Sequence, residues 1–187
     1  MIMLLGILAP GSLDTVPKQT VPRTTLQNAT TTASAGSGLP SPETWYPVKR
    51  VVDGDTIVVI IGTKLVKVRL IGLDTPETVD PRKPVQCFAK EASAEASKIL
   101  TGVSVRLETD PSQDTYDKYG RLLAYVFVPL NSNPEGLLFN QYMIREGYGH
   151  EYTYDLPYKY QKQFKAAEKS AREQKKGLWS DGVCPLN

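Results

Sequence analysis

Residues 53–78, which read DGDTIVVIIGTKLVKVRLIGLDTPET, determine the fold more than any other part of the chain. The β-branched run over residues 56–61 is typical of a strand. Gly62 then opens a two-residue connection, the pattern of a type II′ hairpin turn. Apolar and basic residues alternate over residues 64–72. We therefore expect a second strand there, with Arg69 on the opposite face from its apolar neighbours.

Further elements follow on both sides of this hairpin. We expect a strand over residues 46–52, a helix over 88–100, strands over 103–109 and 122–128, and helices over 133–147 and 155–176. The helix at 133–147 is inferred from Asn133 as its N-cap and Pro134 in its first turn. This order is α+β. Five short strands with an inserted helix predict a five-stranded Greek-key OB-fold β-barrel with three α-helices.

The chain divides by composition into three parts. Residues 1–10 are apolar but too few to span a bilayer, and they resemble the core of a signal peptide or the remnant of an anchor, although no Lys or Arg precedes them. Residues 11–44 are rich in Thr, Ser, Pro and Gly, which predicts a disordered linker. Residues 45–187 form the expected folded domain. We expect a secreted or cell-envelope protein, tethered to the membrane if its N-terminus is retained.

The net charge and the cysteine content limit which kinds of binding site the chain can contain. The net charge of the 187 residues is +2, so any anion-binding surface must arise from local placement of charge. The chain contains two cysteines, Cys87 and Cys184, and one histidine, His150, which disfavours a zinc site. The two cysteines form a disulfide in an oxidising compartment or remain free thiols, and the sequence leaves both open.

Acidic residues gather at the predicted strand ends. Asp53 is best interpreted as a turn former. Asp55, Asp74 and Glu77 are harder to explain in this way, because nearby carboxylates repel one another unless a cation compensates them. Asp55 and Asp74, with the carbonyl oxygen of Thr75, would give a sparse oxygen site that suits calcium, although magnesium also fits these residue types.

Two arginines complete this constellation. Arg69 and Arg121 donate in a planar fork that matches phosphate oxygens, although either is also explained as a surface charge. Together with a divalent cation they would stabilise the negative charge of a phosphoryl transition state. Glu77 would then position or deprotonate an attacking water.

The stretches DGDT, VRLIGLDTPET and DKYGRLLAYV, in this order, resemble the staphylococcal nuclease (thermonuclease) family. The segments QCFAKEAS, REGYG and GLWS extend the resemblance over residues 45–185. Each motif is weak alone, whereas their order and spacing together are specific. The loop over residues 79–86 and the two cysteines depart from the pattern of the best-known member.

The resemblance implies a role for each matching residue. Asp55, Asp74 and the Thr75 carbonyl fall on the calcium ligands, Glu77 on the catalytic glutamate, and Arg69 and Arg121 on the catalytic arginines. Four further positions fall on substrate-binding residues: Lys118, Tyr119, Tyr152 and Tyr154. The implied function is a calcium-dependent endonuclease that acts on DNA and RNA, leaves 3′-phosphate ends and works as a monomer.

Two other functions remain to be weighed against this one. A non-catalytic OB-fold module would bind nucleic acid or a protein partner, but relatives of that kind lose acidic or arginine positions that are all filled here. A structural cell-surface module is supported only by the predicted linker.

Overall fold

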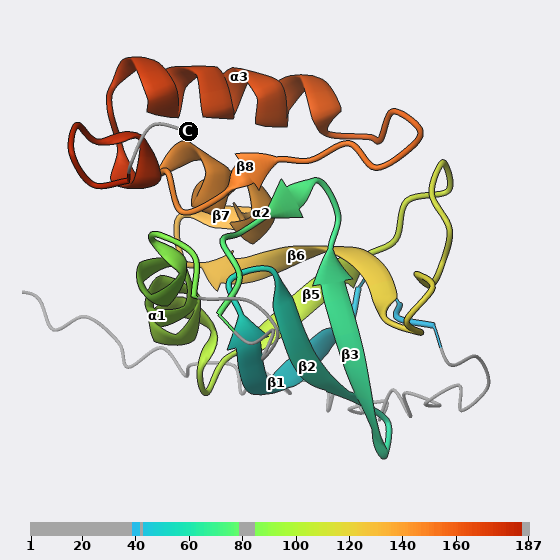
Figure 1. Cartoon of the computed structure of the whole chain (residues 1–187). Helices are drawn as coiled ribbons and strands as arrows, with labels where there is room; N and C mark the ends of the chain where they lie inside the picture. The colour runs from blue at the N-terminus through green and yellow to red at the C-terminus, as the bar shows by residue number, and fades with distance from the viewer. Residues whose placement is uncertain (1–38, 42, 79–84, 185–187) are drawn as a thin grey trace, which may run out of the picture. The chain divides into compact units, whose positions relative to one another are not determined.

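The computed structural model of the chain describes residues 39–41, 43–78 and 85–184, and Figure 1 shows how their helices and strands are arranged. The apolar segment predicted over residues 1–10, and nearly all of the linker predicted over residues 11–44, lie outside this part of the chain. Within the described ranges, no helix has both the length and the apolar composition of a membrane span.

Five strands form a closed barrel: β1 (Trp45–Asp53), β2 (Thr56–Ile61), β3 (Lys64–Leu70), β5 (Ser104–Glu108) and β6 (Leu122–Leu130). The first three form an antiparallel meander, and β5 returns to pair with β1. β6 pairs antiparallel with β5 and parallel with β3, which closes the barrel. The predicted five-stranded Greek-key OB-fold is confirmed.

The β2–β3 hairpin has the predicted turn. Ile61 pairs with Lys64, and Gly62 between them has a φ of 61°, which a type II′ turn requires at its first position. Side chains alternate between the barrel interior and its outer face along β3, so that Val68 and Leu70 are buried. Arg69 lies on the outer face, as predicted.

Three α-helices complete the fold: α1 (Ala89–Leu100), α2 (Phe139–Arg145) and α3 (Gln161–Glu173), followed by the 3-10 turn η1 (Gly177–Trp179). In Figure 1, α1 lies beside the barrel, and α2 lies between the barrel and α3. A separate two-stranded ribbon joins β4 (Leu73–Asp74) to β8 (His150–Glu151). The number of helices agrees with the prediction, although α3 is shorter at both ends.

The start of the second helix was predicted wrongly. Residues 133–138 form the strand β7 (Asn133–Leu138), which pairs with β6, and α2 begins only at Phe139. The Asn133 side chain accepts a hydrogen bond from the Glu135 amide at 3.0 Å, so it initiates a turn and does not cap a helix. Gly136 then has a φ of 81° and lies so close to the Val128 carbonyl that a side chain would collide with it.

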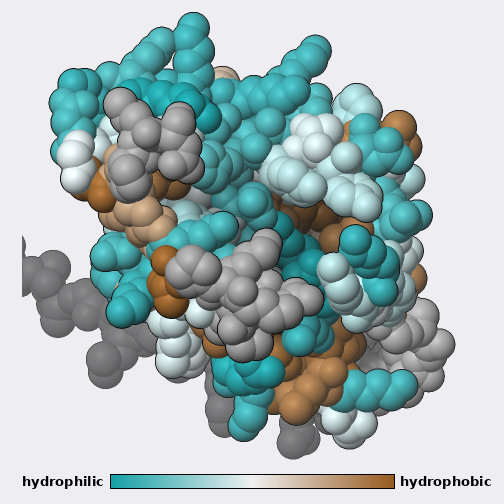
Figure 2. Space-filling model, viewed as in Figure 1, coloured by the Kyte–Doolittle hydropathy of each residue, from teal (hydrophilic) through white to brown (hydrophobic). Residues whose placement is uncertain are grey.

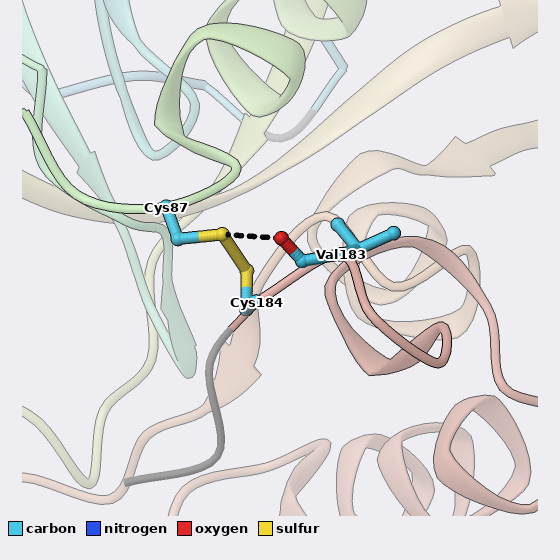
Figure 3. The surroundings of a disulfide bond; sticks show 3 residues. All are labelled: Cys87, Val183 and Cys184. Atoms are coloured by element: carbon cyan, nitrogen blue, oxygen red, sulfur yellow. Dashed lines mark hydrogen bonds between the residues drawn. A yellow bond between two sulfur atoms is a disulfide. The ribbon is translucent and has the colours of Figure 1, made fainter.

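The two cysteines are joined. Cys87 and Cys184 form a disulfide with an S–S distance of 2.06 Å, and the Cys87 sulfur lies 3.2 Å from the Val183 carbonyl oxygen (Figure 3). The bond attaches the C-terminal segment after η1 to the residues that precede α1. It resolves the alternative that the sequence left open.

Removing this bond should destabilise the domain. Because it links positions 97 residues apart, the double variant Cys87→Ser/Cys184→Ser should lose about 2–4 kcal/mol of unfolding free energy, mainly through a less constrained unfolded chain. Urea unfolding without reductant measures the difference, with the wild type in reductant as the control. Equal midpoints for oxidised wild type and variant would contradict the expectation.

Candidate active site

A cleft of about 740 Å³ opens between the end of β3, the start of β6, the loop that precedes β6 and the segment that follows β8. Seven of the residues singled out from the sequence line it: Arg69, Asp74, Lys118, Tyr119, Arg121, Tyr152 and Tyr154. The other three, Asp55, Thr75 and Glu77, are not among the lining residues. Asp55 and Thr75 are buried directly behind the wall, in contact with Arg69 or with each other.

Arg69 joins the two acidic strand ends. Its Nη1 forms an ion pair with the Asp55 carboxylate, and its Nη2 donates to Asp74 Oδ1 at 2.8 Å. Asp55 also accepts a hydrogen bond from the Thr75 amide at 3.0 Å and from the Thr56 hydroxyl at 2.9 Å. One guanidinium therefore fixes both carboxylates, and its own side chain is only 13% exposed.

The local sequence explains how Asp55 comes so close to Thr75. Asp55 follows Gly54 in the turn between β1 and β2, where a Cβ atom on Gly54 would lie 2.7 Å from the Thr75 side chain. Only glycine lets this turn pack against the strand end after β3. The Leu70 amide donates to the Asp55 carbonyl at 2.9 Å and holds the two segments together.

Arg121 is fixed by a residue of its own turn. Its Nε donates to Asp117 Oδ2 at 2.6 Å, and its backbone amide donates to Asp117 Oδ1 at 2.9 Å. Burial alone would raise the pKa of Asp117, but these hydrogen bonds outweigh it and hold that pKa below its ordinary value. The Nη1 of Arg121 lies 3.5 Å from the hydroxyl of Thr56, which in turn donates to Asp55. A continuous polar chain thus connects the two arginines.

Glu77 lies at the margin of this network. Its backbone amide donates to the Gln86 side chain at 2.7 Å, and the Gln86 amide donates back to the Glu77 carbonyl at 3.2 Å. Its charge contributes to raising the pKa of Asp53, which places it within electrostatic reach of the β1–β2 turn. The structure therefore puts Glu77 near the acidic cluster but outside the lining of the cleft.

The acidic residues outnumber the cations that compensate them. Burial, together with the charge of Asp55, raises the pKa of Asp53 to about 7. Burial also raises the pKa of Asp74, against the opposing effect of Arg69. Within the described ranges, no three His, Cys, Asp or Glu side chains gather around one point as a metal site. The sparse oxygen shell of Asp55, Asp74 and the Thr75 carbonyl stays a prediction from the sequence.

Exposed aromatic and basic side chains border the cleft. Lys118 Nζ lies 5.2 Å from the centre of the Tyr119 ring, and the Arg121 guanidinium lies 5.4 Å from the same ring. The Tyr152 and Tyr154 rings are 6.3 Å apart on the segment after β8. These rings offer flat surfaces beside a cationic wall, which suits stacking of bases next to phosphates.

Three residues of this network were not among the predicted site residues. Asp53 forms the predicted turn, because its Oδ1 accepts a hydrogen bond from the Asp55 amide at 3.2 Å, but it is also only 8% exposed and belongs to the acidic cluster. Thr56 and Asp117 stood within the quoted stretches without an assigned role. The spacing of Asp117, four residues before Arg121, is a signal that could have suggested an ion pair.

Comparisons with known proteins agree on one family. The family model described as "Staphylococcal nuclease homologue" matches residues 67–181. A thermonuclease of Staphylococcus hyicus is 43% identical over 139 residues, which is 74% of this chain and 78% of that protein. A thermonuclease of Staphylococcus intermedius is 42% identical over 72% of this chain and 75% of its own. The endonuclease YncB of Bacillus subtilis is 40% identical over 70% of this chain and 59% of its own.

The different burial of the two ion pairs predicts different costs when each is broken. Arg69 and Asp55 side chains are 13% and 9% exposed, so Arg69→Met leaves a buried carboxylate uncompensated and should cost about 3–5 kcal/mol. The Asp74 side chain is 51% exposed, so Asp74→Asn should cost about 0–1 kcal/mol. Urea unfolding in chelator compares the two variants. Equal losses would show that Arg69 is not the centre of the network.

Proposed function

Because the chain belongs to the staphylococcal nuclease family, we propose that it is a calcium-dependent endonuclease that hydrolyses phosphodiester bonds of DNA and RNA and leaves 3′-phosphate ends. Its thermonuclease and endonuclease relatives share the activity of a nuclease, and the chain is a nuclease in this general sense. The observation that carries the finer proposal is the polar chain Arg121–Thr56–Asp55–Arg69–Asp74, whose arginines and Asp74 line the cleft while Asp55 and Thr56 lie behind them.

The two arginines would bind and neutralise the scissile phosphate. Guanidinium groups keep their charge at every working pH and match phosphate oxygens with two parallel donors. Asp117 holds Arg121 by its Nε and backbone amide, and Asp55 and Asp74 hold Arg69 by both Nη atoms. Donors fixed in advance of the reaction need no reorganisation as charge develops, so they stabilise the transition state more than the bound substrate.

The donor set also suits a hard divalent cation. Asp55, Asp74 and the Thr75 carbonyl are oxygen donors of the kind that such a cation prefers. Burial, followed by the charge of neighbouring Asp55, raises the pKa of Asp53, and burial raises the pKa of Asp74 against the opposing effect of Arg69. Calcium held by these three residues would supply positive charge beside the phosphate. Asp74 is the more accessible carboxylate, with half of its side chain exposed.

Glu77 would serve as the general base, or as the residue that orients the attacking water. A catalytic base needs to lie within hydrogen-bond reach of the proton it accepts, directly or through one water. The reciprocal hydrogen bonds with Gln86 hold the Glu77 backbone beside the acidic cluster. Gln86 precedes Cys87, so the disulfide supports the same segment.

The exposed residues around the cleft would bind the rest of the nucleotide. Lys118 and Tyr119 would contact a substrate phosphate from the turn that carries Arg121. Tyr152 and Tyr154 would stack on a base, and their exposed rings in the lining of the cleft favour this role.

Several features of the protein's setting are part of the same proposal. DNA and RNA would be its substrates, and it would act as a monomer. The disulfide favours an oxidising compartment, in line with a secreted or cell-envelope protein. We propose the following organisation of the chain. Residues 1–10 would tether it to the membrane, residues 11–44 would form the linker, and residues 45–187 would form the nuclease domain.

Removing the metal tests the cofactor. Chelation should abolish cleavage of denatured DNA, and calcium should restore it better than magnesium, because a sparse and flexible oxygen shell tolerates calcium more readily. A plate assay with and without chelator gives the first answer. Full activity in excess chelator would refute the metal-dependent mechanism, and loss of all cleavage under every condition would favour a non-catalytic binding module.

Substitutions at the proposed catalytic residues test the chemistry. Arg121→Lys keeps the charge but loses the planar fork, and should lower kcat about 10²–10³-fold with a smaller effect on substrate affinity. Glu77→Gln should lower kcat by on the order of 10²–10⁴. Single-turnover cleavage of a defined oligonucleotide measures both, with Arg145→Lys on an exposed face of α2 as the matched control. Cleavage by Arg121→Lys and Glu77→Gln at the control rate would disprove the site.

A further inference from the structure

A row of side chains crosses the outer face of the barrel next to the cleft. Arg50 of β1 pairs with Val58 of β2, and Val58 pairs with Lys67 of β3. The parallel register of β3 and β6 pairs Val68 with Leu122, which places Lys67 beside Arg121 one residue earlier. Residues opposite one another in neighbouring strands share a face of the sheet. Three cations and one valine therefore form a line that ends at the proposed active site.

This row faces outward. The neighbours of Lys67 and Arg121 in their strands, Val68 and Leu122, are buried in the barrel core, so the alternation of a strand turns the two basic residues to the outside. Val58 is not part of the core cluster, although it is only 5% exposed. Arg50 and Lys67, which flank Val58 in register, are both exposed.

The two outer cations carry uncompensated charge. Arg121 is paired with Asp117, and Arg106 on another strand lies near Glu108. By contrast, no acidic side chain within the described ranges forms an ion pair with Arg50 or Lys67. Neighbouring strands lie about 4.8 Å apart, so the row from Arg50 to Arg121 extends over about 14 Å. A polyanion with one phosphate per nucleotide can follow a row of this length over several nucleotides.

An apolar patch adjoins the cations. Ile60 pairs with Leu65 on the same outer face, and Leu65 is 64% exposed. Figure 2 shows this patch as a brown area over the β2–β3 hairpin, bordered by hydrophilic surface. A single strand presents unstacked bases as well as phosphates, whereas a duplex keeps its bases stacked inside. The combination of cations and exposed apolar side chains therefore favours a single strand as the occupant.

From this arrangement we infer that Arg50, Lys67 and the adjoining apolar patch form a second binding surface, which holds the flanking part of a single-stranded nucleic acid whose scissile phosphate lies in the cleft. The inference rests on the proposed nuclease function and extends it from the cleft to the outer face of β1, β2 and β3. The surface would raise affinity for long substrates, while the cleft determines cleavage.

Binding of oligothymidylates of 3 and 15 nucleotides tests the inference. Fluorescence anisotropy in chelator avoids cleavage. The variant Arg50→Gln/Lys67→Gln keeps most of each side-chain stem and should weaken binding of the 15-mer about tenfold. It should also reduce the slope of log affinity against log salt by about 1.4, since each phosphate contact on a single strand contributes about 0.7. The ratio of 15-mer to 3-mer affinity should fall accordingly.

A matched control is available on α3. Lys162 and Lys165 are exposed, and no acidic side chain of the described residues pairs with them. α3 lies on the far side of the molecule from the β2–β3 hairpin (Figure 1), so Lys162→Gln/Lys165→Gln makes the same charge change away from the row. The inference would be overturned if the two double variants bound the 15-mer with equal affinity and with an equal slope of log affinity against log salt.

Three further measurements separate the other outcomes. Arg50→Lys/Lys67→Arg retains both charges and should bind the 15-mer like the wild type, so weak binding by this variant would contradict an electrostatic contact. If Arg50→Gln/Lys67→Gln lost as much affinity for duplex DNA as for the single strand, the choice of a single strand as the occupant would be refuted. Wild-type protein that fails to cleave any oligonucleotide in calcium would instead refute the proposed function, whatever the affinities.

Discussion

The short parallel pairing of β3 with β6 is the constraint on which the rest of this structure depends. It closes the barrel and places Arg69 beside Leu123, two residues after Arg121. A shift of one residue in this register would turn Arg69 toward the core and Val68 toward water. The buried Asn140 of α2 supports the pairing from behind, because its side chain accepts from the Val126 amide and donates to the Ile71 carbonyl. The helix layer thus secures the geometry of the cleft without lining it.

Burying charged side chains at the strand ends costs free energy, and the contacts around Asp55 offset that cost. Asp55 is almost enclosed, yet both of its carboxylate oxygens accept hydrogen bonds or ion pairs from Arg69, Thr56 and Thr75. A buried ion pair of this kind contributes little net stability but holds its members in one arrangement. Burial, followed by the charge of neighbouring Asp55, raises the pKa of Asp53 to about 7. The proposed calcium ion, held by Asp55 and Asp74, would lie beside this cluster of carboxylates and compensate part of their charge.

The parts of the fold that depend on local pattern were predictable, and those that depend on distant partners were not. The β2–β3 hairpin followed from the alternation around Arg69 and from Gly62 in its turn. The start of the second helix was predicted wrongly because Asn133 and Pro134 signal a turn as well as a helix, and pairing with β6 decided between them. The site residues emerged from their resemblance to a family, whereas the burial of Asp53 has no signal in its local sequence. The disulfide likewise depends on two segments that meet only in the folded chain.

The alternation of β3 assigns stability and recognition to opposite faces of one strand. Its inner residues Val66, Val68 and Leu70 pack on or in the core, while Leu65, Lys67 and Arg69 follow one another on the outer face. Along that outer line, Leu65 is apolar, Lys67 is cationic and exposed, and Arg69 is cationic and nearly buried. An extended substrate that follows this line would first meet contacts of low specificity and then the fixed guanidinium of the cleft. Because the two faces are separated by the pleat, the outer line can change with little effect on the core, which leaves affinity for long substrates free to vary while the closed barrel keeps the proposed catalytic residues in place.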